Sequence, residues 1–127
     1  MARPALFVLL ILLGIYLKAQ EDNCSHLSSN WTSEKQAITQ IENRTFKTNE
    51  SISMSDSSRI SSIQYCSCDD KFGFLLIKSE NNKFLHKDVP ASVWIALKNA
   101  KSNTGYYKYY IKNKYLFETT ILQNQKL

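Results

Sequence analysis

Histidine and glycine are both scarce in this chain, with two of the first and three of the second in 127 residues. No Gly-rich phosphate loop, nucleophile elbow or HExxH helix occurs, so the motifs of common nucleotide-dependent, hydrolytic and zinc-dependent enzymes are missing. His26 and His86 are the only side chains that could act as bases at neutral pH without a large change in pKa, and His86 is more simply a half-buried strand residue. The acids Asp69 and Asp70 stand where a turn is expected, and turns favour Asp for backbone reasons. We therefore expect no catalytic residues and no cofactor.

Cysteine is also scarce, and the number is odd, with residues Cys24, Cys66 and Cys68. After any single disulfide one thiol is left over. A bridge from Cys24 to Cys66 or to Cys68 would tie the N-terminal part to the first hairpin, whereas separate thiols or a bridge between two chains are the alternatives. A bridge between Cys66 and Cys68 would be strained by its short spacing. No metal site is expected, because C-x-C with one distant histidine lacks the paired spacing of zinc sites.

Long hydrophobic runs are absent apart from one near the N-terminus. Arg3 precedes an apolar run of thirteen residues, 5–17, which Lys18, Ala19 and Gln20 follow. A transmembrane helix needs roughly 20 apolar residues, whereas this shorter run with a basic start is typical of a secretory signal peptide. We therefore predict that residues 1–19 form a signal peptide cleaved after Ala19, and that the protein is secreted or periplasmic in a bacterium. An uncleaved N-terminal membrane anchor is the alternative interpretation.

Residues 20–56 are predicted to form an N-terminal arm with one short helix and a polar linker. Ser33 can cap a helix over residues 34–43, because apolar residues then share one face. The serine-rich residues 49–58 fit a polar linker or a weak edge strand. At the other end of the chain, residues 118–127 have no clear period and are predicted to be a C-terminal tail. The apolar residues of the arm helix and its flanking anchors are Trp31, Ala37, Ile38, Ile41 and Phe46.

Residues 57–117 contain the best strand patterns and most of the aromatic residues, so they are predicted to form the domain. Alternation over 59–65 predicts a first strand. Residues 72–79 predict a second strand that is apolar on both faces, as a central strand is. The polar turn 80–82 then leads to a short third strand over 83–87. The expected sheet is an antiparallel three-stranded meander.

Two short helices are predicted after the sheet. Asp88 offers a capping carboxylate, and Pro90 stands where a helix can begin. Residues at helical spacing then occur in two sets separated by a break at 102–105. The predicted fold class is α+β, with the meander followed by two short helices on one face and an additional N-terminal helix. The two sets are Val93, Trp94, Leu97 and Ala100, and then Tyr107, Tyr110, Ile111 and Lys114.

The domain carries a recurring pattern of Ser and Ile in the first strand, Tyr at its end, Val-Pro after the third strand, and a Ser/Gly break before a Tyr-rich helix. Its residues are Ser58, Ile60, Ile63, Tyr65, Phe84, Val89, Pro90, Trp94, Leu97, Ala100, Ser102, Gly105, Tyr106, Tyr107, Ile111 and Tyr115. In these residues the chain resembles the KTSC domain, a family named for its occurrence at the C-terminus of some lysyl-tRNA synthetases. It differs at Leu85 and His86, where a second Tyr is usual, at Gly105, which lies one residue later than expected, and at Lys108, where Asn is usual. The resemblance implies the KTSC fold over residues 57–117 and suggests contact with RNA.

Acidic residues are missing from the last part of this domain. Residues 91–117 carry five lysines and no Asp or Glu, and 59–117 as a whole carries ten basic residues against four acidic ones. If Tyr107, Tyr110 and Ile111 form the buried stripe of the last helix, its remaining tyrosines and lysines face solvent. Tyrosine supplies rigid contact area and lysine attracts anions. The candidate ligand contacts are Tyr106, Lys108, Tyr109 and Lys112.

Two functions fit these features. The first is an exported, non-catalytic binding domain of KTSC type whose ligand is unknown and whose partner is a protein or a polyanion. The alternative is binding of RNA or another polyanion through the Lys- and Tyr-rich helices, by phosphate neutralisation and base stacking. Against both stands the plain structural interpretation, in which the lysines form a solvated helix face and Tyr107 and Tyr110 pack in the core.

Overall fold

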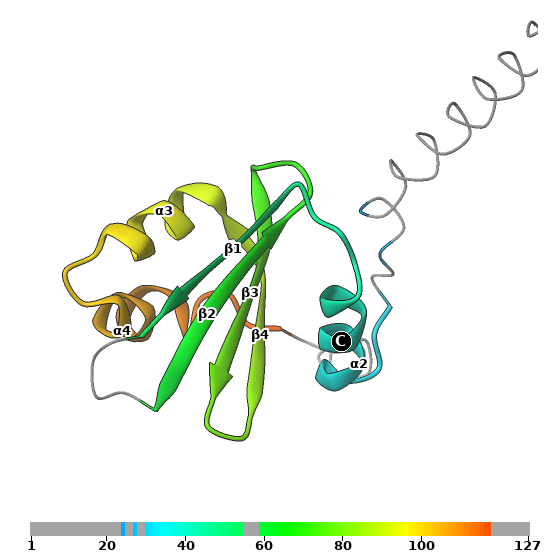
Figure 1. Ribbon diagram of the computed structural model, residues 1–127, viewed down its shortest axis with the longest axis horizontal. Helices are drawn as coiled ribbons and strands as arrows, with labels where there is room; N and C mark the ends of the chain where they lie inside the picture. Colours follow the sequence, from blue (N-terminus) through cyan, green and yellow to red (C-terminus); the bar gives the residue numbers. More distant parts are fainter. Residues whose placement is uncertain (1–23, 25–26, 28–29, 55–58, 118–127) are drawn as a thin grey trace, which may run out of the picture.

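The computed structural model describes residues 24, 27, 30–54 and 59–117 (Figure 1). The predicted signal peptide, residues 1–19, and the predicted tail, residues 118–127, lie outside the described residues. Within the described ranges, no helix is both long enough and apolar enough to cross a membrane.

Four antiparallel strands form one sheet in the order β1-β2-β3-β4. They are β1 (Thr48–Ser53), β2 (Ile60–Ser67), β3 (Phe72–Ser79) and β4 (Lys83–Pro90). The α+β class and the antiparallel meander are confirmed, but the expected number of three strands is wrong. The start of the serine-rich segment, within Thr48–Ser53, pairs with β2 as a fourth strand, in a register that sets Ile52 opposite Ile63, and residues 55–58 lie outside the described residues. Ile52 is the one apolar residue of β1, so this edge strand has almost no hydrophobic pattern in the sequence.

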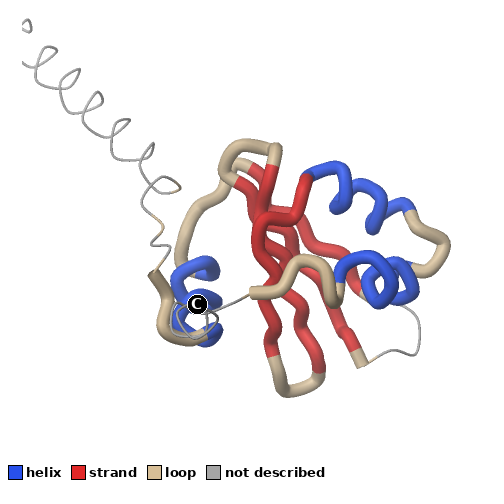
Figure 2. The backbone as a smooth tube through the Cα atoms, turned by 180° about the vertical axis from the view of Figure 1, so that it is seen from behind, coloured by secondary structure: helices blue, strands red, loops and turns tan. Residues whose placement is uncertain are grey.

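Helices cover both faces of the sheet, so the fold has three layers (Figures 1 and 2). Helix α2 (Glu34–Glu42) packs on one face, and α3 (Ala91–Asn99), α4 (Asn103–Tyr106) and the π-helical turn η1 (Tyr107–Ile111) pack on the other. The N-terminal helix is confirmed together with its cap, because the Ser33 hydroxyl accepts a hydrogen bond from the backbone N–H of Gln36 at 3.1 Å. The prediction that the last helices pack on one face of the sheet is confirmed as well.

Each face of the sheet has its own hydrophobic core. Alternate residues of a strand point to opposite faces, so β3 contributes to both cores, as the sequence predicted for a central strand. On the side of α2, the α2 face, the buried residues are Trp31, Ala37, Ile38, Ile41, Phe46, Cys66, Leu76 and Leu85. On the other side, the α3–η1 face, they are Ile63, Tyr65, Leu75, Ile77, Val89, Trp94, Leu97, Tyr107 and Ile111.

A stacked aromatic pair joins α3 to the centre of the sheet. Trp94 lies on Tyr65 with ring centroids 5.3 Å apart and ring planes 13° from parallel. The Tyr65 hydroxyl donates a hydrogen bond to the Val89 carbonyl at 3.0 Å. Gly73 is required next to this pair, because a Cβ there would collide with the Cys66 carbonyl oxygen and lie 2.9 Å from the Tyr65 ring.

Asp88 does not cap a helix, which corrects the expectation from the sequence. Strand β4 continues to Pro90, and α3 begins at Ala91 with no side-chain cap. The β3–β4 register shifts between Gly73 and Leu75, and Asp88, opposite this shift, has a positive φ of 56°. Asp tolerates that backbone conformation better than most residues. The extra residue lets His86 and Val89 both join the α3–η1 face, which strict alternation would not allow.

The last helix also departs from the expected spacing. Tyr107 and Ile111 are buried, as predicted, but Tyr110 is 61% exposed, so its expected burial is wrong. The cause is the π-helical turn, in which the backbone N–H of Lys112 donates to the Tyr107 carbonyl five residues earlier, at 2.9 Å. A π turn has more residues than an α turn, so the side chains between Tyr107 and Ile111 move around the axis.

Candidate functional site

His86 anchors the last helix to the sheet through both of its ring nitrogens. Its Nδ1 lies 2.8 Å from the Tyr115 carbonyl oxygen and its Nε2 lies 2.7 Å from the Tyr107 hydroxyl. A carbonyl oxygen only accepts, so Nδ1 carries the proton, and the Tyr107 hydroxyl donates to Nε2. Burial lowers the pKa of His86 and raises the pKa of Tyr107 to about 12, so both groups are neutral at pH 7. The pair holds η1 against β4 without a charge.

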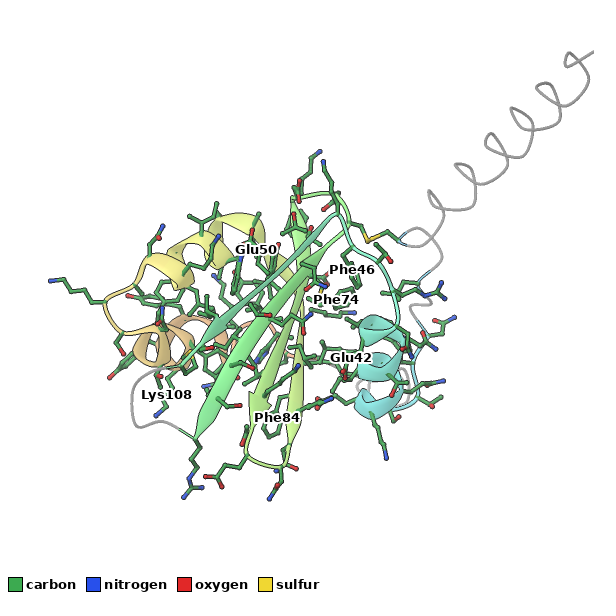
Figure 3. All side chains as sticks on the ribbon, viewed as in Figure 1. Glu42, Phe46, Glu50, Phe74, Phe84 and Lys108 are labelled. Carbon is green, nitrogen blue, oxygen red and sulfur yellow. A yellow bond between two sulfur atoms is a disulfide. The ribbon has the colours of Figure 1, made fainter. Side chains whose placement is uncertain are left out.

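An open hollow of about 350 Å³ lies between η1 and the neighbouring ends of β2, β3 and β4. Its lining is mainly apolar, and three basic side chains are part of it. Phe84 is 46% exposed there, so its ring adds apolar surface to the hollow. Figure 3 labels Phe84 on β4 and Lys108 on η1. We call this feature the cation-rimmed hollow, and its residues are Arg59, Ile60, Ile77, Phe84, Tyr107, Lys108 and Lys112.

The three cations of the hollow differ from the paired lysines of the protein. Lys47, Lys83 and Lys98 lie 3.2, 2.9 and 2.7 Å from Asp70, Glu42 and Glu50, respectively. Hydrogen bonds from Lys98 and, to a smaller extent, from Trp94 lower the pKa of the Glu50 carboxyl. By contrast, Arg59, Lys108 and Lys112 form no ion pair with any described residue, and no described acid lines the hollow. Their positive charge is therefore available to an anion.

A second hollow, of about 390 Å³, lies on the other side of the same helical turn. Tyr109 is 87% exposed beside it, and the rings of Tyr106 and Tyr110 lie 4.8 Å apart between centroids. Exposed tyrosine rings offer rigid contact area. We call this feature the tyrosine hollow, and its residues are Val93, Tyr106, Tyr109, Tyr110, Asn113, Lys114 and Tyr115.

The four ligand contacts expected from the sequence are divided between the two hollows. Lys108 and Lys112 line the cation-rimmed hollow, whereas Tyr106 and Tyr109 line the tyrosine hollow. They therefore form two neighbouring surfaces and not one mixed surface. Sequence reasoning missed the strand residues of the first hollow. The only local signal for them was Phe84, an aromatic residue in a strand of mixed pattern, because the others join the hollow through strand register. The missed residues are Arg59, Ile60, Ile77 and Phe84.

The cysteines lie on the α2 face, away from both hollows. Cys24 and Cys68 form a disulfide with their Cα atoms 5.8 Å apart, and Cys66 is a free, buried thiol. Burial raises the pKa of Cys66 to about 11, so this thiol is a poor nucleophile at neutral pH. Cys66 and His86 belong to opposite faces of the sheet, which separates two of the residues considered for a metal site. Among the described residues, no three His, Cys, Asp or Glu side chains are grouped to hold a metal ion.

The arrangement has two chemical capacities. The cation-rimmed hollow can hold an apolar group beside an anion, and the tyrosine hollow can hold a flat or ring-shaped group. Neither lining contains an acid or an imidazole with a free nitrogen among the described residues. The chain matches no protein-family model, no curated protein and no solved structure.

Proposed function

We propose that this chain is an exported, non-catalytic binding domain of KTSC type that holds an anionic ligand at the cation-rimmed hollow. The observation that carries the proposal is a mainly apolar lining surrounded by three cations that form no ion pair within the described part of the chain, Arg59, Lys108 and Lys112. Like charges that line one hollow without a described acid among them repel one another slightly. An anion that enters the hollow would neutralise them.

The KTSC assignment is supported by where the pattern residues lie. Those of the strands and of the two helices meet in one core on the α3–η1 face, around the stacked pair of Tyr65 and Trp94. Positions that recur in a family pattern and pack together usually define a fold. The departure at His86 has a physical reason in this chain, because the imidazole occupies an aromatic position and binds the Tyr107 hydroxyl.

Export is supported by the predicted signal peptide and by the disulfide between Cys24 and Cys68. Disulfides persist in oxidising compartments and are rare in the cytoplasm. The mature protein should begin at Gln20, as measured by intact mass. Exported protein that retains residues 1–19 would contradict cleavage and favour the membrane anchor.

We propose that the chain does not catalyse a reaction, because the titratable groups near the hollow are already hydrogen-bonded to other groups of the protein. Both ring nitrogens of His86 are hydrogen-bonded, and the Tyr107 hydroxyl donates to one of them. The high pKa of Tyr107 keeps its proton in place at neutral pH. A general base needs an accessible lone pair within hydrogen-bond reach of its substrate, and this pair presents none to the hollow.

An extended polyanion such as RNA is the second candidate ligand, and the tyrosine hollow favours it. Tyr109 could stack on a base while Lys108, Lys112 and Lys114 contact phosphates. A strand bound in this way would cross η1 and use both hollows. A compact anion would use the cation-rimmed hollow alone.

Salt dependence separates these two ligand classes. Binding of a short single-stranded oligonucleotide, measured by fluorescence anisotropy, should be weak and fall steeply with salt, since each phosphate contact contributes a slope of about −0.7 on a log–log plot. We expect a compact anion to give a slope near −1 or shallower. Tight oligonucleotide binding with a slope of several units would overturn the first candidate in favour of the second.

Charge reversal then locates the site. Lys108→Glu with Lys112→Glu should abolish binding of the anion, and Lys35→Glu with Lys71→Glu is the matched control, because it changes the net charge equally at exposed lysines away from the hollow. Equal loss in both double variants would show a general charge effect and contradict the proposed site.

A further inference from the structure

We infer that the cation-rimmed hollow takes a small amphiphile, with an apolar chain as its body and one carboxylate or phosphate as its head. The inference rests on the proposed function and names its ligand class. The structural basis is the juxtaposition of an apolar lining from three strands with three cations, one directly before β2 and two on the last helical turn, that form no ion pair with a described residue.

The body of the ligand is apolar because the lining offers it few hydrogen bonds. Ile60, Ile77 and Phe84 line it with hydrocarbon, and although Ile77 is only 1% exposed, Phe84 keeps nearly half of its surface exposed. The one hydroxyl in the lining belongs to Tyr107, and its proton is directed to His86 at 2.7 Å. A sugar or a base would have to give up hydrogen bonds to water there without replacing them, which costs free energy. An alkyl chain forms no hydrogen bonds with water, so it loses none when it binds.

The head of the ligand is anionic because the charges around the apolar lining are all positive. Arg59 follows the β1–β2 connection, and Lys108 and Lys112 lie four residues apart on the last helical turn. The planar guanidinium of arginine matches carboxylate and phosphate oxygens in paired hydrogen bonds, and two lysines add attraction without a fixed geometry. The head group would lie at this positive rim while the chain points inward.

The size of the hollow limits the ligand to one short chain. About 350 Å³ is near the lower end of the volumes that hold small molecules in proteins, which run from about 300 to 1,000 Å³. An extended polymer would lie across the mouth of the hollow and leave its apolar surface uncovered. The ligand is therefore a free single-chain amphiphile.

A series of straight-chain carboxylates tests this assignment by isothermal titration calorimetry on the full mature chain, below the concentrations at which the ligands form micelles. From hexanoate to octanoate to decanoate, affinity should rise about fourfold for each methylene that enters the hollow. Longer chains should then give a plateau, because added methylenes stay in water. A rise that never stops, or no dependence on length, would overturn the inference, since either result excludes a bounded apolar site.

Head-group controls test the anion. Decanol, which has the same chain without the charge, should bind about tenfold more weakly than decanoate, because it loses charge-assisted hydrogen bonds. Decyl phosphate should bind at least as well as decanoate, and inorganic phosphate alone should bind much more weakly. Equal binding of decanol and decanoate would overturn the role of the cations. Anionic vesicles of phosphatidylglycerol that capture the protein more tightly than decanoate does would overturn a free amphiphile in favour of a membrane surface.

Variants on the two sides of the helical turn locate the ligand. Phe84→Ser should weaken decanoate binding about tenfold by removing apolar contact area, and Tyr109→Ala, in the tyrosine hollow, should leave it unchanged. An unchanged thermal unfolding midpoint in Phe84→Ser establishes that the variant is folded. Lys112→Ala, at the exposed C-cap of η1, should also weaken decanoate binding. Decanoate binding that Tyr109→Ala weakens and Phe84→Ser does not would move the ligand out of the hollow and overturn the inference.

Two kinds of failure are distinguishable. If no alkyl carboxylate binds but another anion does, and Lys108→Glu with Lys112→Glu abolishes that binding, the amphiphile is wrong and the proposed anion site stands. If that double variant changes no anion binding at all, both proposals are wrong.

Discussion

The two faces of the sheet are closed by different means. The α2 face is covered by one helix, an aromatic cluster in which Trp31 contacts Phe74 and Phe117, and a disulfide to Cys24. The α3–η1 face is covered by helices that specific polar contacts hold in place, including His86 to Tyr107 and Trp94 to Glu50. Both named hollows lie next to the α3–η1 face, and a further hollow of about 510 Å³, with a more polar lining, lies between α2 and the β3–β4 turn.

This difference separates stability from binding. A covalent link and aromatic packing can close a face without a precise helix position. On the α3–η1 face, hydrogen bonds fix η1 at one place on β4, and the space beside it stays open. A rigid element next to an unfilled space is the usual setting of a binding site. Substitutions in either core should therefore lower stability strongly, whereas substitutions around η1 should change binding and leave stability unchanged.

The largest effect is expected at Trp94, which is 2% exposed and stacks on Tyr65. Trp94→Ala should lower the free energy of unfolding by about 3–5 kcal/mol, because it leaves a cavity and removes the stacked ring. Urea denaturation measures this. Ile95→Ala, on the same helix but 53% exposed, is the control and should cost under about 0.5 kcal/mol. Similar midpoints for the two variants would mean that the α3–η1 core does not depend on the stack.

The next largest effect on stability is expected from the disulfide on the α2 face. Cys24 and Cys68 are 44 residues apart in sequence, and a crosslink of this kind stabilises a small protein by about 2–4 kcal/mol. Cys68→Ser should therefore lower the urea midpoint, and reductant should lower the midpoint of the wild type to a similar value. In Cys66→Ala, which keeps the crosslink, reductant should still act. A wild-type midpoint that reductant leaves unchanged would contradict a stabilising bridge.

A pH effect is expected from His86 on the α3–η1 face. Burial lowers the pKa of His86 below its ordinary value of 6.5, so the unfolded chain binds more protons than the folded one just below that pH. The stability from neutral His86 is thus present above about pH 6.5 and is lost as pH falls below it. Urea midpoints at pH 7 and about pH 5.5 should show this loss, and His86→Gln should reduce it.

Other groups do not produce the same loss in that pH window. The pKa values of Glu50, Asp69 and Asp70 are lowered by their hydrogen-bond donors, so their contribution disappears only below the ordinary carboxyl range. Burial raises the pKa of Glu34, which acts in the opposite direction. Stability that is equal at the two pH values, or higher in acid, would contradict a neutral His86 as the anchor of η1.

The smallest effect is expected around η1. Tyr109 and Lys112 are both exposed, so Tyr109→Ala with Lys112→Ala should change the free energy of unfolding by under about 0.5 kcal/mol. Tyr107→Phe should cost more, about 1–3 kcal/mol, because it leaves the buried Nε2 of His86 without its donor. Thermal unfolding of both variants makes the comparison. An equal loss in the two would show that the exposed residues are structural.

The sequence predicts the elements of this fold where hydrophobic periodicity is strong. Strand β3 has the predicted bounds, and α2 has the predicted cap and buried face. The fourth strand was predicted only as the alternative to a polar linker, because an edge strand with only Ile52 as an apolar residue has no detectable period. The turn at Asp88 was assigned to a helix cap, since a positive φ leaves no mark in the hydrophobic pattern.

The candidate site was predicted only in part, for a related reason. Lys108 and Lys112 were found because neighbours on one helical turn can be inferred from spacing. Tyr110 was placed on the wrong side because the π turn changes that spacing. The strand residues of the cation-rimmed hollow depend on the register between β2, β3 and β4, and on the shift opposite Asp88, which no local pattern encodes.

The most direct test of the central claim is a methyl NMR titration of the mature chain with decanoate, using isoleucine labels. Ile60 and Ile77 line the cation-rimmed hollow, Ile38 and Ile41 belong to the α2 face, and Ile95 is exposed on α3. If the hollow holds the apolar chain, the methyl signals of Ile60 and Ile77 shift and saturate together, and the other three stay in place. Saturating shifts at Ile95, or at Ile38 and Ile41, with Ile60 and Ile77 unmoved, would contradict the account.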